Sequence, residues 1–143
     1  MLFRSDGSPR RTYALLSDAE CNEGAVWEAA MFAAHHRLCN LTAVIDCNGQ
    51  QALGKTADVL QMEPQTERWQ SFGWRPIEVD GHDPVALQAA FAEAVRGETP
   101  SVVLARTSAG KGVSFMEDKV EWHYLPMTDE QYASALNEVA ADR

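Results

Sequence analysis

Asp18 and Asn48 carry oxygen atoms that can bind a hard cation, and each follows an apolar segment of the chain. The segments are Thr12–Ser17 and Leu41–Cys47, and the two polar residues are thirty positions apart. Carboxylate and amide oxygens are ligands that Mg²⁺ accepts in proteins, usually together with the phosphate oxygens of a substrate. If the segments are neighbouring parallel strands, their carboxyl ends meet at the sheet edge where open α/β proteins bind ligands. The sequence therefore predicts a magnesium site at that edge.

The residues between these segments predict a helix that connects two parallel strands. Through residues 23–38, small and apolar side chains recur at helical spacing: Ala25, Val26, Ala29, Ala30, Ala33 and Ala34. A strand, a helix and a second strand in this order form a crossover, which makes the strands parallel. We expect Asn22 to cap the helix, since asparagine side chains accept hydrogen bonds from the first helical amides.

The rest of the chain continues this alternation of helices and strands. The predicted elements are helix 65–72, strand 75–79, helix 84–96 capped by Asp83, strand Ser101–Arg106 and a terminal helix from Thr128 or Asp129 to about Ala141. Residues 49–64 are a long polar segment with weak periodicity, and loops of this length often cover a site. We therefore predict an α/β fold with a parallel sheet and helices on both faces, in one domain over residues 1–143.

Composition argues against several classes of partner. The net charge of −9 disfavours nucleic acid and anionic membrane surfaces. No run reaches about eighteen apolar residues, and the start of the chain lacks the apolar core of a signal peptide, so neither a membrane span nor secretion is expected. Cys21, Cys39 and Cys47 have no Cys-x-x-Cys spacing, which is typical of reduced thiols in a cytoplasmic protein.

Residues 17–51 resemble the thiamine diphosphate (ThDP) motif of transketolases, in which an Asp between two glycines precedes a helix and then an Asn. The residues that follow Ala19, ECNEGAVWEAAMFAAHH, are similar to the transketolase version in particular. Two later segments resemble the family in the same order, GKGVSFME at 110–117 and EWHY at 121–124. The likeness runs from about Arg11 to the C-terminus. The chain thus resembles the N-terminal, diphosphate-binding subunit of a split transketolase, which implies a partial form of the ThDP-binding fold.

The resemblance implies a site for ThDP and a divalent cation, Mg²⁺ or Ca²⁺. The cation would be bound by Asp18, by Asn48 and by the backbone carbonyl of Gln50. The diphosphate would rest against backbone amides in the turn that follows the Asp, at Ala19 and Glu20.

The chain departs from the motif at the two glycines, which are replaced here by Ser17 and Ala19. Ala19 keeps an amide that can donate to phosphate, but it also adds a Cβ atom to a tight turn. If this position requires a positive φ or a close approach of phosphate, cofactor affinity is expected to fall.

Four more residues receive roles from the resemblance, each with a simpler alternative. His123 matches a histidine that contacts the diphosphate and the reacting substrate, although it could be an ordinary loop histidine. Lys111, between two glycines, could approach phosphate or lie in solvent. Glu23 and Glu28 match glutamates at a dimer interface that link two cofactor sites; the alternative is a solvated helix start, where acidic residues are favoured.

ThDP chemistry also needs a glutamate on a pyrimidine-binding domain, and nothing in this chain resembles that domain. The resemblance therefore implies two partners: a chain that supplies the family's upstream segment, and the pyrimidine-binding, C-terminal transketolase subunit. A sheet without that upstream segment should expose an apolar edge or face. The implied reaction transfers a two-carbon ketol unit from a ketose to an aldose, with sugar phosphates as substrates. Alternatives are a non-catalytic structural subunit, a ThDP-dependent carboligase of a biosynthetic pathway, or a fragment of a longer chain.

Overall fold

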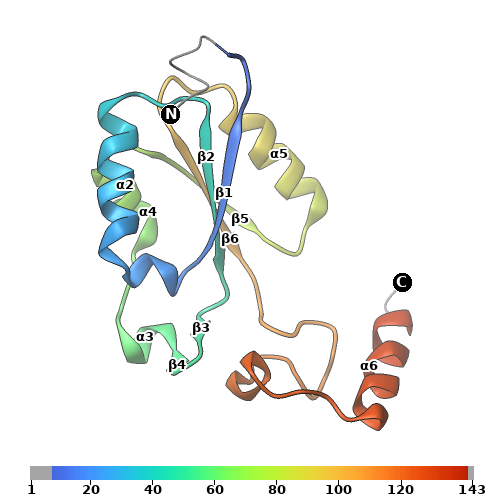
Figure 1. The fold of residues 1–143 in the computed structure, drawn as a ribbon. Helices are drawn as coiled ribbons and strands as arrows, with labels where there is room; N and C mark the ends of the chain where they lie inside the picture. Colours follow the sequence, from blue (N-terminus) through green and yellow to red (C-terminus); the bar gives the residue numbers. More distant parts are fainter. Residues whose placement is uncertain (1–7, 142–143) are drawn as a thin grey trace.

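Four parallel strands form the centre of the computed structural model, which describes residues 8–141. The strands β1 (Thr12–Ser17), β2 (Leu41–Cys47), β5 (Arg75–Asp80) and β6 (Ser101–Arg106) are arranged in the order β1-β2-β6-β5 (Figure 1). Their register keeps the carboxyl ends of neighbouring strands level, since the last residue of β1 pairs with Asp46 near the end of β2. The predicted parallel sheet is therefore confirmed.

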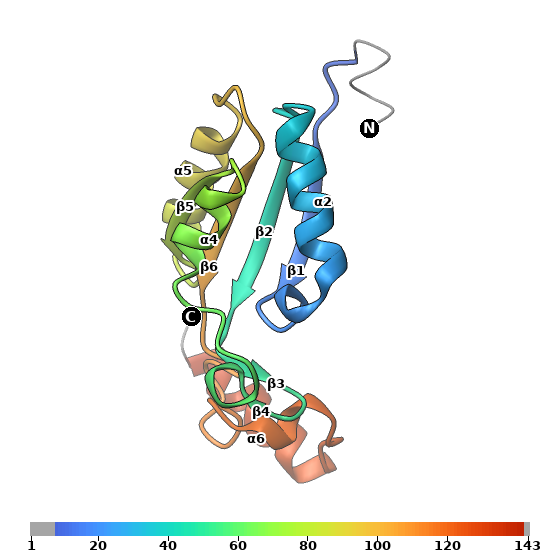
Figure 2. The same ribbon diagram turned by 90° about the vertical axis from the view of Figure 1, so that its left-hand side faces the viewer.

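Helices cover both faces of the sheet, as predicted. α2 (Gly24–His35) and α4 (Gln65–Ser71) pack on one face, where they lie side by side in Figure 2, and α5 (Pro84–Ala94) packs on the other. Asp83 caps α5 as expected, because its carboxylate accepts hydrogen bonds from two amides of the first turn at 2.8 and 3.1 Å.

Three tryptophans fill the core between the sheet, α2 and α4. The Trp69 ring contacts the rings of Trp27 and Trp74, with centroids 5.1 and 5.0 Å apart. Trp74 Nε1 donates to the Ala30 carbonyl at 2.9 Å, and Trp69 Nε1 donates to Gln65 Oε1 at 3.2 Å. Buried indole N–H groups need such partners. Because the buried positions of α2 are alanines, the helix leaves room for these large rings.

The ends of α2 differ from the prediction. Asn22 does not cap the helix: it ends a short 3-10 turn, η1 (Glu20–Asn22), and Glu23 takes the N-cap position without a side-chain hydrogen bond. The helix stops at His35, before the expected residue 38, because Arg37 has a left-handed φ of 49°. Neither feature is visible in the spacing of alanines, which reports only the buried face of the helix.

The polar segment after β2 contains more secondary structure than predicted. It forms a small hairpin from β3 (Gln50–Gln51) and β4 (Gly54–Lys55), followed by the short helix α3 (Thr56–Val59). In Figure 1 these elements lie beyond the carboxyl ends of β1 and β2. The segment therefore lies beside the predicted site, as loops of this length often do.

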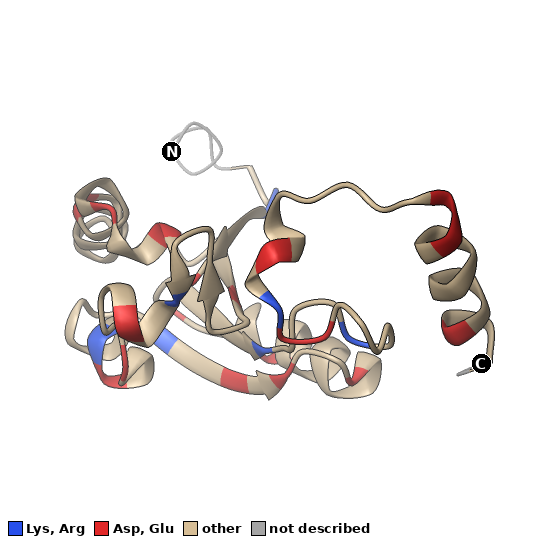
Figure 3. Cartoon of the chain, turned by 90° about the horizontal axis from the view of Figure 1, so that it is seen from below, with Lys and Arg blue, Asp and Glu red and all other residues tan. Residues whose placement is uncertain are grey.

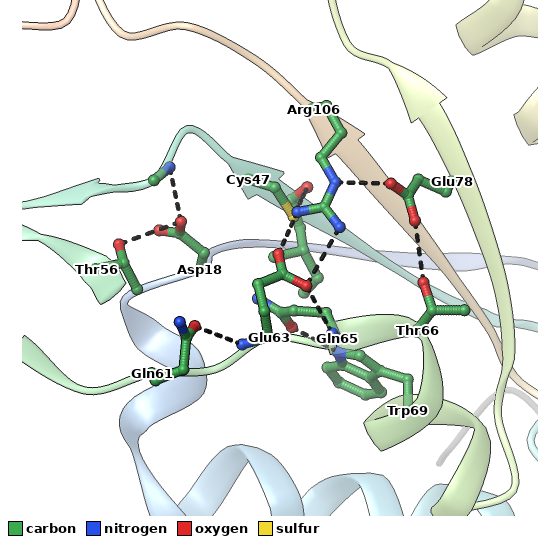
Figure 4. A network of polar contacts seen from close by, with 12 residues as sticks. Asp18, Cys47, Thr56, Gln61, Glu63, Gln65, Thr66, Trp69, Glu78 and Arg106 are labelled. Carbon is green, nitrogen blue, oxygen red and sulfur yellow. Dashed lines mark hydrogen bonds and ion pairs between the residues drawn. The ribbon is translucent and has the colours of Figure 1, made fainter. Parts of the chain in front are cut away.

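An ion-pair clamp, formed by Arg106, Glu63 and Glu78, holds the end of this segment against the sheet (Figure 4). Arg106 Nε donates to Glu78 Oε1 at 2.9 Å, and the other guanidinium nitrogens donate to the Glu63 carboxylate. Glu78 also accepts a hydrogen bond from the Thr66 hydroxyl at 3.0 Å. The Arg106 guanidinium lowers the pKa of both carboxyl groups.

After β6 the chain leaves the sheet. It passes through η2 (Val120–His123) to α6 (Asp129–Ala141), a helix that stands apart from the sheet and carries acidic but no basic residues (Figure 3). Thr128 caps α6: its hydroxyl accepts from the Gln131 amide at 3.3 Å, and Gln131 Oε1 accepts from the Thr128 amide at 2.9 Å. Within residues 8–141, no helix is long and apolar enough to cross a membrane.

The free edge of the sheet is apolar, as expected. In the described part of the chain β1 pairs only with β2, and two of its large side chains, Leu15 and Tyr13, are 74% and 52% exposed. Proteins usually cover or charge such edges, because unpaired strands and apolar patches promote association.

Replacing Arg106 by Gln should loosen the segment that ends at Glu63 without unfolding the sheet. We expect faster hydrogen exchange in residues 56–63 and a stability loss of at most about 1 kcal/mol, since the paired groups are partly exposed. Folding lowers the pKa values of Glu63 and Glu78, so the clamp contributes its full stability at pH values above the ordinary carboxyl pKa. This contribution is lost as the pH falls through the lowered pKa values.

Thermal unfolding of wild type and variant over a pH series measures this difference, with Arg96→Gln as a charge-matched control. If the difference in thermal stability between wild type and Arg106→Gln does not become smaller as the pH is lowered, the prediction is contradicted.

Candidate functional site

Asp18 is buried at the end of β1, where only 4% of the residue is exposed. Its Oδ2 atom accepts hydrogen bonds from the Gly49 amide at 2.8 Å and from the Thr56 hydroxyl at 3.3 Å, the second of which is drawn in Figure 4. The other carboxylate oxygen, Oδ1, has no hydrogen-bond partner among the residues that the structure describes. A buried carboxylate with one unpaired oxygen is an available ligand for a cation.

The environment of Asp18 opposes a negative charge. Removal from water raises the pKa of this carboxyl group, and the nearby charge of Asp46 raises it further, while the hydrogen bonds from Gly49 and Thr56 and the neighbouring Ala19 amide act in the opposite direction. A bound cation would supply the missing positive charge.

Asn48 directly precedes Gly49, whose amide donates to Asp18, but the Asn48 side chain has local partners. Asn48 Oδ1 accepts from the Gln50 amide at 2.8 Å, and Nδ2 donates to Asp46 Oδ2 at 3.2 Å. The other oxygen of Asp46 accepts from the Thr107 hydroxyl. An amide oxygen has two lone pairs, so Asn48 Oδ1 can bind a cation while it keeps the Gln50 amide.

Gln50 is 5% exposed, and its main chain pairs with Lys55 across the β3–β4 hairpin. Its side-chain Oε1 has no partner among residues 8–141. In the same part of the chain, no group of three His, Cys, Asp or Glu side chains could hold a metal ion. A cation at Asp18 would therefore depend on amide, main-chain and ligand oxygens, which are the donors that the sequence predicts.

The turn after Asp18 differs in detail from the expected anion seat. Ala19 has φ −65° and ψ −36°, a right-handed helical conformation that any residue adopts, so its Cβ causes no backbone strain. The Glu20 amide donates to Ser17 Oγ at 3.1 Å, and the Glu20 carboxylate accepts from the Ser17 amide at 2.7 Å. The Glu20 amide is therefore engaged, and it can contact a diphosphate only if it gives up Ser17.

A pocket of about 170 Å³ opens beside Asp18, under the segment that follows β4. Its polar lining includes Asp18, Lys55, Thr56, Glu63 and Arg106. Sequence reasoning did not find Lys55 and Thr56, because they lie in a segment without periodicity. The only sequence signal is Gly54, directly before them, whose φ of 138° allows the chain to turn back toward Asp18.

His123 is exposed on η2, a turn that Trp122 anchors by donating from Nε1 to the Phe115 carbonyl at 2.9 Å. η2 contacts β3, so His123 belongs to a segment on the Gln50 side of the site. Lys111 is also exposed, but it lines a different open pocket, together with Arg106 and His82. The structure therefore does not bring Lys111 into the Asp18 pocket.

His82, Glu23 and Glu28 have simpler environments. His82 lies in the turn after β5, and its Nε2 accepts a hydrogen bond from the Ser108 amide at 2.8 Å. Glu23 and Glu28 are exposed at the N-terminal part of α2 and are accessible to a partner.

The cysteines near the site are space-filling residues. Cys21 is fully buried and Cys47 is 7% exposed. Burial raises the pKa of both thiols to about 12, so they stay protonated and unreactive near neutral pH.

Comparison with known proteins agrees with this geometry. Residues 5–142 match the family described as transketolase, thiamine diphosphate binding domain. The chain is 38% identical to a 6-deoxy-6-sulfo-D-fructose transketolase subunit of Clostridium sp., over 97% of this chain and 51% of that protein. It is 36% identical to one subunit of the apulose-4-phosphate transketolase of Phocaeicola vulgatus, over 98% of this chain and 50% of that protein.

A crystal structure of transketolase from Campylobacter jejuni superposes with a TM-score of 0.88 at 25% identity, over 95% of this chain and 21% of that one. The chain spans about half the length of the two bacterial relatives from Clostridium and Phocaeicola. Since the family match covers nearly every residue and the fold agrees, the chain belongs to the transketolase family and forms its thiamine diphosphate-binding domain.

Proposed function

We propose that this chain is the metal- and diphosphate-binding part of a ThDP-dependent transketolase that is active only with partner subunits. The reaction transfers a two-carbon ketol unit from a ketose to an aldose. The observation that carries the proposal is the buried Asp18 carboxylate, whose Oδ1 is unpaired among the described residues, at the strand end of a domain from this family.

Three oxygen donors of this chain would hold a divalent cation, Mg²⁺ or Ca²⁺: Asp18, Asn48 Oδ1 and the Gln50 carbonyl. Bound ThDP would supply a nucleophilic carbon that accepts the ketol unit. The protein contributes position and electrostatics: the Ala19 amide would donate to the diphosphate, whereas the Glu20 amide, expected at the same seat, stays bonded to Ser17.

The remaining polar residues have supporting roles in this proposal. His123 would donate a hydrogen bond to phosphate and move a proton at the reacting substrate, since a neutral imidazole can do both near neutral pH. Lys111 would act as a positive charge at the outer edge of the site, because the structure places it in a neighbouring pocket.

The substrates are proposed to be anionic sugars, chiefly sugar phosphates. Two relatives carry names that refer to a sulfonated ketose and to a phosphorylated ketose. The chain itself carries net charge −9. Contacts to an anionic end group would therefore come mainly from partner subunits.

Partner subunits are proposed to complete the site and the fold. A pyrimidine-binding subunit would supply the glutamate that activates the cofactor, and Glu23 and Glu28 would lie at that interface. A polypeptide equivalent to the upstream part of the relatives would cover the exposed Leu15 and Tyr13 side chains on β1. We also propose a cytoplasmic location, which the three free cysteines support.

One observation favours a second candidate, a non-catalytic structural subunit. The Glu20 amide and the Asn48 oxygen, both expected to bind the cofactor or its metal, already have partners within the chain. Binding of ThDP by the assembled complex separates the two candidates.

Replacing Asp18 by Asn should abolish Mg²⁺-dependent ThDP binding and yet stabilise the metal-free protein. Asn keeps one acceptor for Gly49 and Thr56 but removes the buried charge. A buried polar group left without a partner normally costs about 1–3 kcal/mol. Because burial raises the pKa of Asp18, this gain should be present at neutral pH and vanish as pH falls through the folded-state pKa.

Calorimetric titration and thermal unfolding, with and without Mg²⁺, measure both effects in the chain co-purified with its partners. The matched control is Asp58→Asn, the same substitution at an exposed residue. Equal binding by wild type and Asp18→Asn would refute the metal site, and absence of binding in a folded wild-type complex would favour the structural subunit.

Reconstitution with a pyrimidine-binding partner should be required for activity. We expect ketol transfer from phosphorylated or sulfonated ketoses to an aldose only when ThDP, Mg²⁺ and both subunits are present, as measured by product analysis. Acyl-unit products in place of ketol transfer would identify the chain as part of a carboligase.

A further inference from the structure

Ser17 and Glu20 form a reciprocal pair of hydrogen bonds across the turn that carries Asp18. The Glu20 amide donates to Ser17 Oγ at 3.1 Å, and the Ser17 amide donates to Glu20 Oε2 at 2.7 Å. The Ser17 hydroxyl also donates to the same carboxylate oxygen at 3.3 Å. This is a capping box, in which a serine and a glutamate three residues later satisfy each other's main-chain amides.

The capping box fixes the one side of the turn that the sheet does not hold. On the other side, the Asp18 amide donates to the Asp46 carbonyl at 3.1 Å, which continues the pairing of β1 with β2. The Cys21 amide donates to the Asp18 carbonyl at 3.2 Å, and Cys21 is fully buried. The main chain on both sides of Asp18 is thus restrained. Side chains add to this restraint through the capping box and through the Cys21 thiol, which donates to the Ser17 carbonyl at 3.7 Å.

The Asp18 carboxylate needs such a restraint. It is 96% buried and one of its oxygens lacks a partner among the described residues, so rotation of the turn toward water would lower its free energy. Ala19, between the two halves of the capping box, has helical dihedral angles and adds no strain that would oppose this motion. Ser17 and Glu20 oppose it within the turn, in addition to the Thr56 hydroxyl, which donates to the carboxylate itself at 3.3 Å.

We propose that Ser17 and Glu20 are positioning residues, whose capping box holds Asp18 in its buried orientation and thereby sets the affinity for the metal–diphosphate ligand. Neither side chain touches the ligand in this role. The inference rests on the proposed function, because it assigns a ligand to Asp18, and it adds the reason why serine and glutamate occur at these positions.

The experiment compares four variants of the full chain in its complex with partner subunits. Ser17→Ala and Glu20→Ala remove the capping box, whereas Ser17→Thr and Glu20→Gln keep a hydroxyl and a carbonyl oxygen in the same places. Two measurements are made: hydrogen exchange of the amides of residues 17–20 without cofactor, and titration of ThDP with Mg²⁺.

The chain contains a matched control, the capping box of Thr128 and Gln131 at the start of α6. Thr128→Ala and Gln131→Ala remove the same kind of hydrogen bonds from a segment that holds no proposed ligand of the metal. They should speed exchange at the start of α6 and leave ThDP affinity unchanged.

We expect Ser17→Ala and Glu20→Ala to speed exchange in residues 17–20 and to weaken binding by about three- to tenfold, the equilibrium factor that corresponds to the stability a cap usually contributes. Ser17→Thr and Glu20→Gln should restore affinity to within about twofold of wild type, because their hydrogen bonds remain. Wild-type affinity in both alanine variants, or Glu20→Gln binding as weakly as Glu20→Ala, would overturn the inference.

A wild-type complex that binds no ThDP would refute the proposed function. The exchange data would then test the restraint by themselves: unchanged exchange in residues 17–20 of both alanine variants would refute it as well.

Discussion

Burial of the Asp18 carboxylate is the constraint to which the surrounding structure responds, because protein atoms solvate a charged oxygen much less well than water does. The Gly49 amide and the Thr56 hydroxyl offset part of this cost, yet both bond the same oxygen. The second oxygen stays unpaired among the described residues, and removal from water raises the pKa of the group despite the hydrogen bonds to the first oxygen. This unmet charge is the basis of the proposed cation site.

Three segments from different parts of the chain converge on that carboxylate. The β1–β2 pairing places it at a sheet edge, the hairpin after β2 brings Thr56 to it, and the clamp between Arg106 and Glu63 holds the end of the same segment. The clamp is made of partly exposed ion pairs, which are individually weak. The same segment also contributes Met62 to the core cluster that contains Trp69 and Trp74, so it is held by packing as well as by the clamp.

The two outer strands of the sheet, β1 and β5, differ in how they are covered. α5 covers β5 and β6, whereas on β1 Leu15 is largely exposed and Tyr13 is half exposed beside Phe91 of α5. A domain that spans half of its relatives and exposes an apolar strand edge has the physical properties expected of a component of a larger assembly. The proposed dependence on partners follows from this open edge as well as from the cofactor chemistry.

The sequence by itself determined the local elements and the position of the central residue of the candidate site. Hydrophobic spacing predicted the strands, the main helices and the parallel sheet, and the polar residues after two strands identified Asp18, because periodicity and strand ends are properties of the chain alone. Only the tertiary structure decided that Thr56 donates to Asp18, that Arg106 reaches Glu63, that Glu20 turns back to Ser17, and that Lys111 lines another pocket. The Thr56 and Arg106 contacts, and the place of Lys111, join residues distant in sequence, so packing sets them, not local pattern. The Glu20 contact is local, but it forms only because the β1–β2 pairing fixes the turn.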